Sequence, residues 1–164
     1  MSNLSLVNEN DPILSIPAKP WDWEADGEVA ELAQSMLKLM FENHGIGLAA
    51  PQVGIGKRIL VMGNKERSYI CVNPEIISTE GLYREQEGCL SFPGLWLNVD
   101  RAEKIKVKYQ DIIGREQEHE FTGIVARIFQ HEYDHLNGTC FVNKVGKLSL
   151  DLATKRRAKN LKRK

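Results

Sequence analysis

Two histidines and a glutamate near the end of the chain have the residue types and the spacing of a metal site. His131, Glu132 and His135 form the pattern H-E-x-x-H. On a helix, residues i and i+4 lie on one face with about 5 to 6 Å between their Cβ atoms, so both imidazoles can reach one ion. The neighbouring residues are mostly apolar, and burying these side chains without partners would cost several kcal/mol. We therefore predict that a buried helix carries two metal ligands here.

A catalytic metal site needs a third protein ligand and an open position for water. Zinc peptidases with this motif take that ligand from downstream, but the sixth residue after the motif is Phe141 and only a short, basic stretch follows. Upstream, Cys89 lies in the segment EGCLSFPG, whose glycines and proline are typical of a site loop. A thiolate is a strong ligand, so Cys89 is the predicted third ligand, with a buried structural thiol as the alternative. For Cys71 and Cys140, which lie in strand-like apolar runs, the structural role is the better interpretation.

Hydrophobic periodicity predicts three helices around these residues. The first begins after an N-cap at Asp26 and stops at Gly45. The second begins after Thr122, stops at Gly138, carries the metal motif and has apolar residues on most sides, which predicts a buried position. The third spans about residues 149–162 and is polar enough to lie only on the surface.

The middle of the chain is predicted to be a β region. Strand-like runs, one of which alternates apolar residues with lysines, are typical of half-exposed antiparallel strands. The runs lie at residues 58–63, 69–74, 81–85, 103–111 and 115–121. Before them come an extended arm at residues 11–23 and a glycine-rich loop without regular structure at residues 45–56. With no repeat and no linker, residues 1–164 are expected to form a single domain with a basic tail at residues 153–164.

Composition and charge exclude several classes of protein. The chain is 42% hydrophobic and 27% charged, as in ordinary globular proteins. It has no apolar stretch that approaches the roughly 20 residues of a membrane span and no visible signal or transit peptide, so we expect a soluble protein in the cytoplasm, or in an organellar matrix after import. Three cysteines are too few and too odd a number for a disulfide framework, which favours a reducing compartment. The net charge is zero, but the last ten residues hold seven Lys or Arg.

Three segments in order closely resemble the three signature motifs of the peptide deformylases. They are GIGLAAPQVG at residues 45–54, EGCLSFPG at residues 87–94 and QHEYDHLNG at residues 130–138, and the likeness runs from about Asp11 to Val142. The resemblance implies an α+β fold in which antiparallel strands wrap around a central buried helix that carries the HExxH motif. It also implies a metal-dependent hydrolase that removes the N-formyl group from the N-terminal formylmethionine of nascent polypeptides and releases formate.

The resemblance assigns roles to the chemical residues. It implies that Cys89, His131 and His135 bind one divalent ion with water as the fourth ligand, and that Glu132 is the general base. The ligand types alone suit Zn²⁺, whereas the family points to Fe²⁺, with Ni²⁺ or Co²⁺ as active substitutes. The sequence therefore leaves the identity of the metal open.

The same resemblance implies how the substrate is held. The side chain of Gln52 and the backbone N–H of Leu90 are expected to stabilise the oxyanion, although a loop glutamine could instead bond its own backbone. Ile46 and Gly47 are expected to let the substrate backbone lie alongside as an added strand. The methionine pocket is expected to be lined by Gly88, Ile124, Ile128 and His131, with Trp96 as either a pocket or a core residue. Glu87 and Arg101 are a candidate supporting pair, and Arg127 is expected to pair with a carboxylate.

Two alternative functions differ from a deformylase in the residues that they require. A zinc peptidase should show a downstream third ligand, and none is visible. A non-catalytic, metal-stabilised module that binds nascent chains or ribosomes should lack the general base, but Glu132 is present. The basic tail could dock on ribosomal RNA, since clustered positive charges bind phosphates, or it could be a solvated helix end. No membrane or DNA partner is expected.

Overall fold

The computed structural model describes residues 3–163, so the last residue of the predicted basic tail, Lys164, lies outside the described residues. The helices are α1 (Ala30–Glu42), α2 (Gly123–Leu136) and α3 (Lys147–Lys162), with short 3-10 turns at Pro12–Ser15, Ala50–Val53 and Phe141–Lys144. The strands are β1 (Gly47–Ala49), β2 (Ile59–Gly63), β3 (Ser68–Glu80), β4 (Tyr83–Cys89), β5 (Phe92–Arg101), β6 (Lys104–Gln110) and β7 (Glu116–Thr122). None of the helices formed by these residues is long and apolar enough to cross a membrane.

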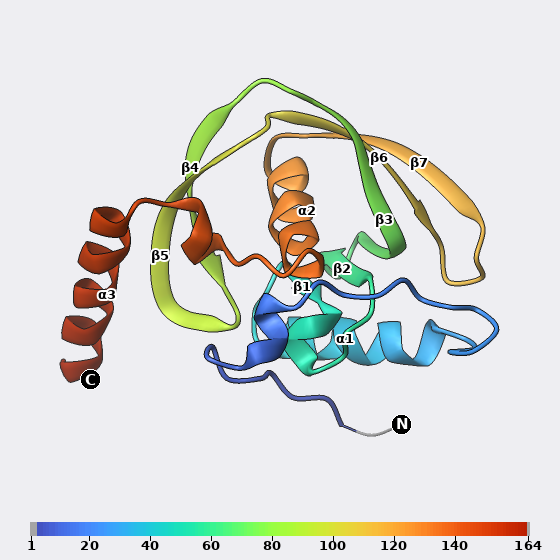
Figure 1. The fold of residues 1–164 in the computed structure, drawn as a ribbon, viewed down its shortest axis with the longest axis horizontal. Helices are drawn as coiled ribbons and strands as arrows, with labels where there is room; N and C mark the ends of the chain where they lie inside the picture. Colours follow the sequence, from blue (N-terminus) through green and yellow to red (C-terminus); the bar gives the residue numbers. More distant parts are fainter. Residues whose placement is uncertain (1–2, 164) are drawn as a thin grey trace.

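The strands form two antiparallel sheets on either side of α2. One sheet has the order β1-β2-β3-β6-β7, and the other is the β4–β5 hairpin. Figure 1 shows α2 upright between the two sheets, with α1 beneath it and α3 beyond the hairpin. The buried residues Ala126, Phe129 and Leu136 of α2 pack into the core of the larger sheet. The predicted α+β fold, with antiparallel strands around a central helix, is confirmed.

The bounds predicted for α2 are confirmed, because local signals fix both ends. The backbone of Thr122 is extended at the N-cap, and Gly138 has a φ of +76°, a conformation that glycine adopts without strain. The expectation that this helix is buried is wrong for its first turn. There the side chain of Ile124 is 61% exposed.

The first helix begins later than predicted. Gly27 has a φ of +78°, which no helix can accommodate, and α1 therefore starts at Ala30 rather than after Asp26. The carboxylate of Asp26 instead accepts a hydrogen bond from the N–H of Asp22 and pairs with Lys57 at 2.8 Å. At the other end His44, with a φ of +57°, takes the left-handed conformation.

The segment at residues 45–56 is more regular than predicted. Its residues Gly47–Ala49 form β1, which pairs with β2 in a register that places Gly47 opposite Met62, and a 3-10 turn follows at Ala50–Val53. A three-residue strand has no sequence signature of its own, since only the partner strand supplies its hydrogen bonds. The extended arm at residues 11–23 likewise contains a 3-10 turn, capped by the side chain of Asp11.

Strand β5 was not predicted at all, although its sequence carries a signal. Leu95, Leu97 and Val99 are buried and alternate with exposed residues, the period of a strand. Because β5 pairs with β4, with Cys89 opposite Phe92, the segment EGCLSFPG is a tight hairpin turn rather than an open loop. The hairpin holds Cys89 next to α2.

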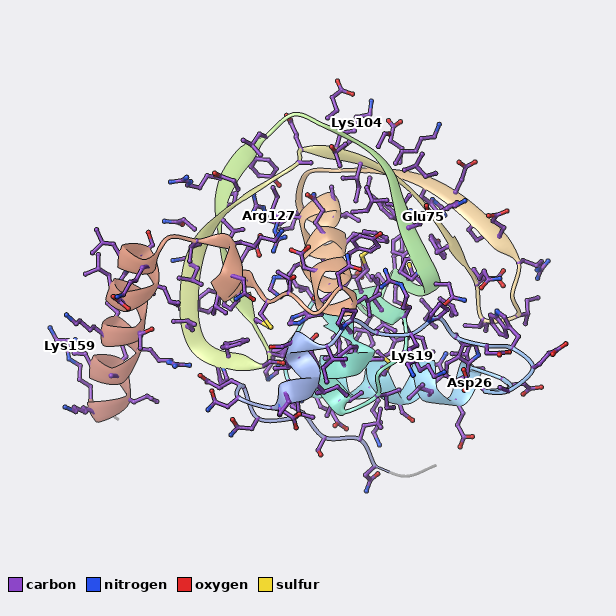
Figure 2. The ribbon with its side chains drawn as sticks, viewed as in Figure 1. Lys19, Asp26, Glu75, Lys104, Arg127 and Lys159 are labelled. Atoms are coloured by element: carbon purple, nitrogen blue, oxygen red, sulfur yellow. The ribbon has the colours of Figure 1, made fainter. Side chains whose placement is uncertain are left out.

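Most charged side chains of residues 3–163 lie on the surface, but four of them, Glu87, Arg101, Arg127 and Glu132, are buried. Lys104 and Lys159 project from the periphery, whereas Arg127 points inward between α2 and the β4–β5 hairpin (Figure 2). Arg127 is 2% exposed, and a charge buried to that degree requires partners. Those partners lie in the candidate site.

Candidate metal centre and substrate cleft

The three predicted metal ligands come together in the structure. One ligand atom each of Cys89, His131 and His135 lies within 4.8 Å of the others, and the Cys89 sulfur is 3.4 Å from Nε2 of His135. The histidines lie on successive turns of α2, and the cysteine lies at the end of β4. One thiolate and two imidazoles are a donor set that transition metals and zinc bind well. The residues present therefore fit a single divalent ion.

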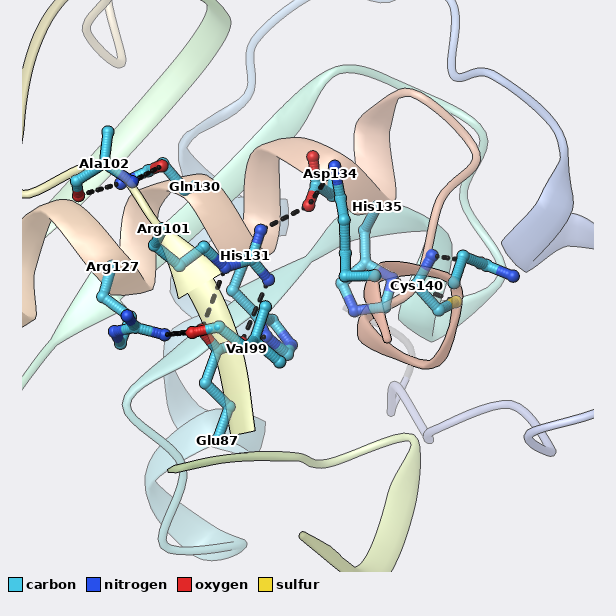
Figure 3. Close-up of polar contacts among 12 residues, drawn as sticks. Glu87, Val99, Arg101, Ala102, Arg127, Gln130, His131, Asp134, His135 and Cys140 are labelled. Carbon is cyan, nitrogen blue, oxygen red and sulfur yellow. Dashed lines mark hydrogen bonds and ion pairs between the residues drawn. The ribbon is translucent and has the colours of Figure 1, made fainter. Parts of the chain in front are cut away.

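His131 is oriented by a buried carboxylate. Its Nδ1 is 2.9 Å from Oε1 of Glu87, which leaves Nε2 to face the other two ligand atoms. Glu87 also accepts hydrogen bonds from Arg101, at 2.9 and 3.0 Å, and from Arg127 (Figure 3). Burial alone would raise the pKa of Glu87, but the hydrogen bonds from His131 and Arg101 lower it to about 2. The expected Glu87–Arg101 pair and the expected carboxylate partner of Arg127 are thus both confirmed.

His135 has a different environment. It is fully buried, and this burial, followed by the neighbouring His131 and Arg101, holds its pKa well below the usual range, so the imidazole is neutral. Its Nδ1 lies 3.8 Å from the sulfur of Cys140. Cys140 is buried as predicted, but it precedes the 3-10 turn at Phe141–Lys144 instead of lying in a strand. Burial raises the pKa of this thiol to about 12, so it remains protonated.

Glu132 points into the site with unused hydrogen-bonding capacity. The residue is 4% exposed, and its Oε1 has no hydrogen-bond partner among the described residues. The other oxygen lies against β1, where a Cβ added to Gly47 would be 2.5 Å from Oε2. Burial raises the pKa of Glu132, and the nearby His131 partly offsets this effect. The resulting pKa is about 7. A buried carboxylate that can gain and lose a proton near neutral pH has the properties of a general base.

Gln52 is held at both ends of its amide. Its Oε1 accepts a hydrogen bond from the N–H of Ala49 at 2.8 Å, and its Nε2 lies 2.9 Å from Oγ of Ser91 and 3.5 Å from the sulfur of Cys89. The amide N–H₂ therefore faces the predicted metal ligands. The amide oxygen bonds the backbone of its own loop, as the alternative interpretation expected. Ser91 was not singled out from the sequence, although it lies within the EGCLSFPG motif.

A cleft of about 570 Å³ opens beside these residues. All the predicted substrate contacts line it, as do Glu132 and Leu90 at the metal end. Three of its large apolar side chains are more than half exposed, namely Ile46 at 54%, Trp96 at 56% and Ile124 at 61%. Trp96 covers Gly88, where an added Cβ would lie 2.6 Å from the ring, so it is a pocket residue rather than a core residue. Sequence reasoning missed part of the lining, which includes Leu6, Asn43, His44, Pro93 and Leu95.

Comparisons with known proteins identify the family. The family model described as polypeptide deformylase matches residues 4–150, most of the chain. The chain belongs to the peptide deformylase family. A peptide deformylase of Acidobacterium capsulatum is 41% identical over 156 residues, which cover 92% of this chain and 91% of that protein. One of Prochlorococcus marinus is 48% identical over 128 residues, covering 74% of this chain and 63% of the relative.

Solved structures of the family have the same fold. A peptide deformylase from Synechococcus elongatus in complex with actinonin superposes with a TM-score of 0.88 at 41% identity, covering 94% of this chain and 86% of the other. The enzyme from Thermus thermophilus superposes with a TM-score of 0.86 at 41% identity, covering 96% and 95% of the two chains. The predicted family and fold are confirmed, and these matches favour a deformylase over both a zinc peptidase and a non-catalytic module. The family is metal-dependent, in keeping with the Cys/His/His group.

Proposed function

We propose that this chain hydrolyses the N-formyl group of formylmethionyl peptides and releases formate. The observation that carries the proposal is the arrangement at the end of the apolar cleft. There, three ligand atoms lie within 4.8 Å of one another beside a buried carboxylate oxygen of Glu132 that has no partner among residues 3–163. Such a site can hold a water molecule between a general base and an electrophilic centre.

Cys89, His131 and His135 are the proposed ligands of one divalent ion. Family resemblance favours Fe²⁺, and the donor set also suits Zn²⁺, Ni²⁺ and Co²⁺. When bound, such an ion supplies Lewis acidity, which makes a water molecule acidic enough to lose a proton near neutral pH.

Glu132 is the proposed proton carrier. It takes a proton from the attacking water as the new carbon–oxygen bond forms, and it returns that proton to the amide nitrogen as the carbon–nitrogen bond breaks. The products are formate and a free methionyl amine. The pKa of about 7 that burial gives this carboxylate suits both directions of transfer.

Gln52 and Leu90 are the proposed donors to the oxyanion that develops on the formyl oxygen. The Nε2 of Gln52 lies 3.5 Å from the Cys89 sulfur and is held there by Ser91, so no reorganisation is needed when charge develops. One such donor typically contributes about 2.7 to 4 kcal/mol to the transition state.

The proposed peptide track runs along β1. This strand is at one end of the five-stranded sheet, so among residues 3–163 no other strand pairs with its outer edge, and an added strand could lie next to Ile46 and Gly47. Main-chain pairing is indifferent to sequence, which suits an enzyme that acts on many nascent chains. Ile124, Ile128, His131 and Gly88 are the proposed walls of the methionine pocket, with Trp96 over Gly88.

We infer a cytoplasmic or organellar-matrix location. We also infer that α3 docks on the ribosome, and the support for this docking is the positive charge of the tail alone. In the predicted tail, Lys155, Arg156, Lys159 and Lys162 are exposed. Ala153 packs against the β4–β5 region and Arg157 pairs with Glu9 at 2.8 Å, so substitution is a cleaner test than deletion. Changing these four of the exposed basic residues to Glu should abolish salt-sensitive co-sedimentation with ribosomes and spare activity on a short peptide. Unchanged sedimentation would refute docking.

The decisive test of the activity is formate release from a formyl-Met tripeptide by protein prepared without oxygen and loaded with Fe²⁺. Wild type should release formate, whereas Glu132→Ala should be slowed about 100- to 10,000-fold while still binding the metal. An acetyl-Met tripeptide is the matched substrate control. If wild type releases no formate but binds metal and peptide, the non-catalytic module is the correct reading.

A further inference from the structure

His135 lies between two cysteine sulfurs, one at each ring nitrogen. Its Nε2 is 3.4 Å from Cys89, a proposed ligand, and its Nδ1 is 3.8 Å from Cys140, for which the sequence indicated only a structural role. Cys140 lies at the end of the loop that follows α2, and Figure 3 places it beside His135 on the side away from Glu87. Both ring nitrogens of His135, the metal-facing Nε2 and the Nδ1, therefore lie next to a cysteine sulfur.

A histidine that uses Nε2 as a ligand carries its proton on Nδ1, and that proton needs an acceptor. For His131 the acceptor is the carboxylate of Glu87 at 2.9 Å. His135 is fully buried, and within residues 3–163 the Cys140 sulfur is the one hydrogen-bond partner of its Nδ1. Without this sulfur a buried N–H group would be left unpaired, which costs about 1 to 3 kcal/mol.

We propose that Cys140 is a positioning residue of the metal centre, whose sulfur accepts the Nδ1–H of His135 and thereby holds Nε2 toward the ion. This inference rests on the proposed metal site. It assigns the second buried thiol to the chemistry of the centre rather than to core packing.

The surroundings of Cys140 hold the thiol in the orientation that this role needs. The backbone N–H of Cys140 donates to Oδ1 of Asn143 at 2.9 Å, and the backbone N–H of Asn143 donates to the carbonyl oxygen of Cys140 at 2.9 Å. Its sulfur is 4.0 Å from the carbonyl oxygen of Leu14, to which the S–H can donate. The sulfur lone pairs then remain free for His135. The 3-10 turn at Pro12–Ser15 is thereby tied to the metal centre through one thiol.

The two histidines would consequently be unequal ligands. An ionised carboxylate is a stronger acceptor than a neutral thiol, so Glu87 makes the His131 imidazole a better electron donor than Cys140 makes His135. Loss of an outer partner of this kind generally lowers metal affinity about 10- to 100-fold. For the weak thiol acceptor we expect the lower end, about tenfold.

The test compares Cys140→Val, which keeps an apolar group of similar size, and Cys140→Ala with the control Cys71→Ala. Cys71 is also a fully buried thiol, but it lies in β3 and does not belong to the Cys89–His131–His135 group. Affinity for Co²⁺, measured by competition with a chelator, should fall about tenfold in both Cys140 variants and stay unchanged in Cys71→Ala. Equal affinity in wild type and both Cys140 variants would overturn the positioning role.

Proton NMR of the Co²⁺-loaded protein gives a readout that a packing role would not move. The paramagnetic ion shifts the Nδ1–H protons of both coordinated histidines far from the other signals, and each exchanges with solvent. In Cys140→Val one of the two should move and exchange faster, while the other stays. Two unchanged signals would overturn the proposal. If wild type binds no Co²⁺, the metal centre itself fails, and formate release shows separately whether the activity fails too.

Discussion

The carboxylate of Glu87 and the imidazole of His131 meet at 2.9 Å in a buried position, with two arginines on the far side of the carboxylate. One carboxylate therefore pairs with both Arg101 and Arg127, next to the Arg101–Asp134 pair, and also orients a proposed metal ligand. A single side chain from the hairpin thus contributes to both the stability of the fold and the geometry of the site.

Replacing this carboxylate by an amide should be strongly destabilising. Glu87→Gln keeps the shape but leaves the buried guanidinium of Arg127 without its carboxylate partner and Arg101 with Asp134 alone. This should lower the unfolding free energy by about 3 to 5 kcal/mol at pH 7 in urea titrations. Asp100→Asn removes the exposed partner of Arg84 and should change stability little. Similar losses in the two variants would contradict this account.

The same carboxylate predicts a pH dependence of stability in metal-free protein. Its folded-state pKa is lowered from 4.5 to about 2, so its contribution is fully present above pH 4.5 and is lost as the pH falls toward 2. The unfolding free energy of wild type should decrease across this window. Part of that decrease should be absent in Glu87→Gln, and an identical pH profile in the two proteins would show that Glu87 is not responsible.

Loss of the amide donor at residue 52 should slow the chemical step. Gln52→Glu retains an acceptor for the N–H of Ala49 but cannot donate to an oxyanion, so kcat should fall about 100- to 1,000-fold with a smaller change in KM. Ser91→Ala removes only the hydroxyl beside Nε2 and should have a milder effect. Steady-state kinetics on a formyl-Met tripeptide measures both, and an unchanged kcat for Gln52→Glu would exclude the oxyanion role.

A methyl group on β1 should disturb the general base. In Gly47→Ala the new Cβ would lie 2.5 Å from Oε2 of Glu132 and 2.9 Å from Ile128, so the carboxylate has to move and kcat/KM should fall at least about tenfold. Gly56→Ala is the matched control, because an added Cβ there meets nothing within 4 Å. Equal kinetics for the two variants would mean that the contact at Gly47 is unimportant.

Removal of the metal should abolish activity and lower thermal stability. An ion present at 100 times its Kd stabilises the folded state by about 2.7 kcal/mol, which for a chain of this length corresponds to roughly 5 to 10 °C in Tm. Chelation followed by a calorimetric scan measures the loss, and added Fe²⁺ or Co²⁺ should restore it. A Cys89→Ala variant should show the low Tm with or without metal. A stabilisation by metal that survives in this variant would place the ion elsewhere.

The sequence by itself determined the central helix and the chemistry that it carries. The spacing of His131 and His135 and the end signals at Thr122 and Gly138 are local, and local patterns survive without knowledge of the fold. The choice of Cys89 followed from its motif and from the lack of a downstream ligand. Three motifs in order were sufficient for the family, and the α+β architecture followed from it.

The Glu87–Arg101 pair was expected from the sequence, but only the tertiary structure decided the other side-chain contacts that support these residues. The Ser91–Gln52, Glu87–Arg127 and Cys140–Leu14 contacts join residues 39, 40 and 126 positions apart, and no periodicity reports such distances along the chain. Strand β1 likewise exists because β2 pairs with it. Hydrogen bonds within a helix are fixed by neighbours in sequence, whereas strand pairing and buried ion pairs depend on partners that only folding brings into contact.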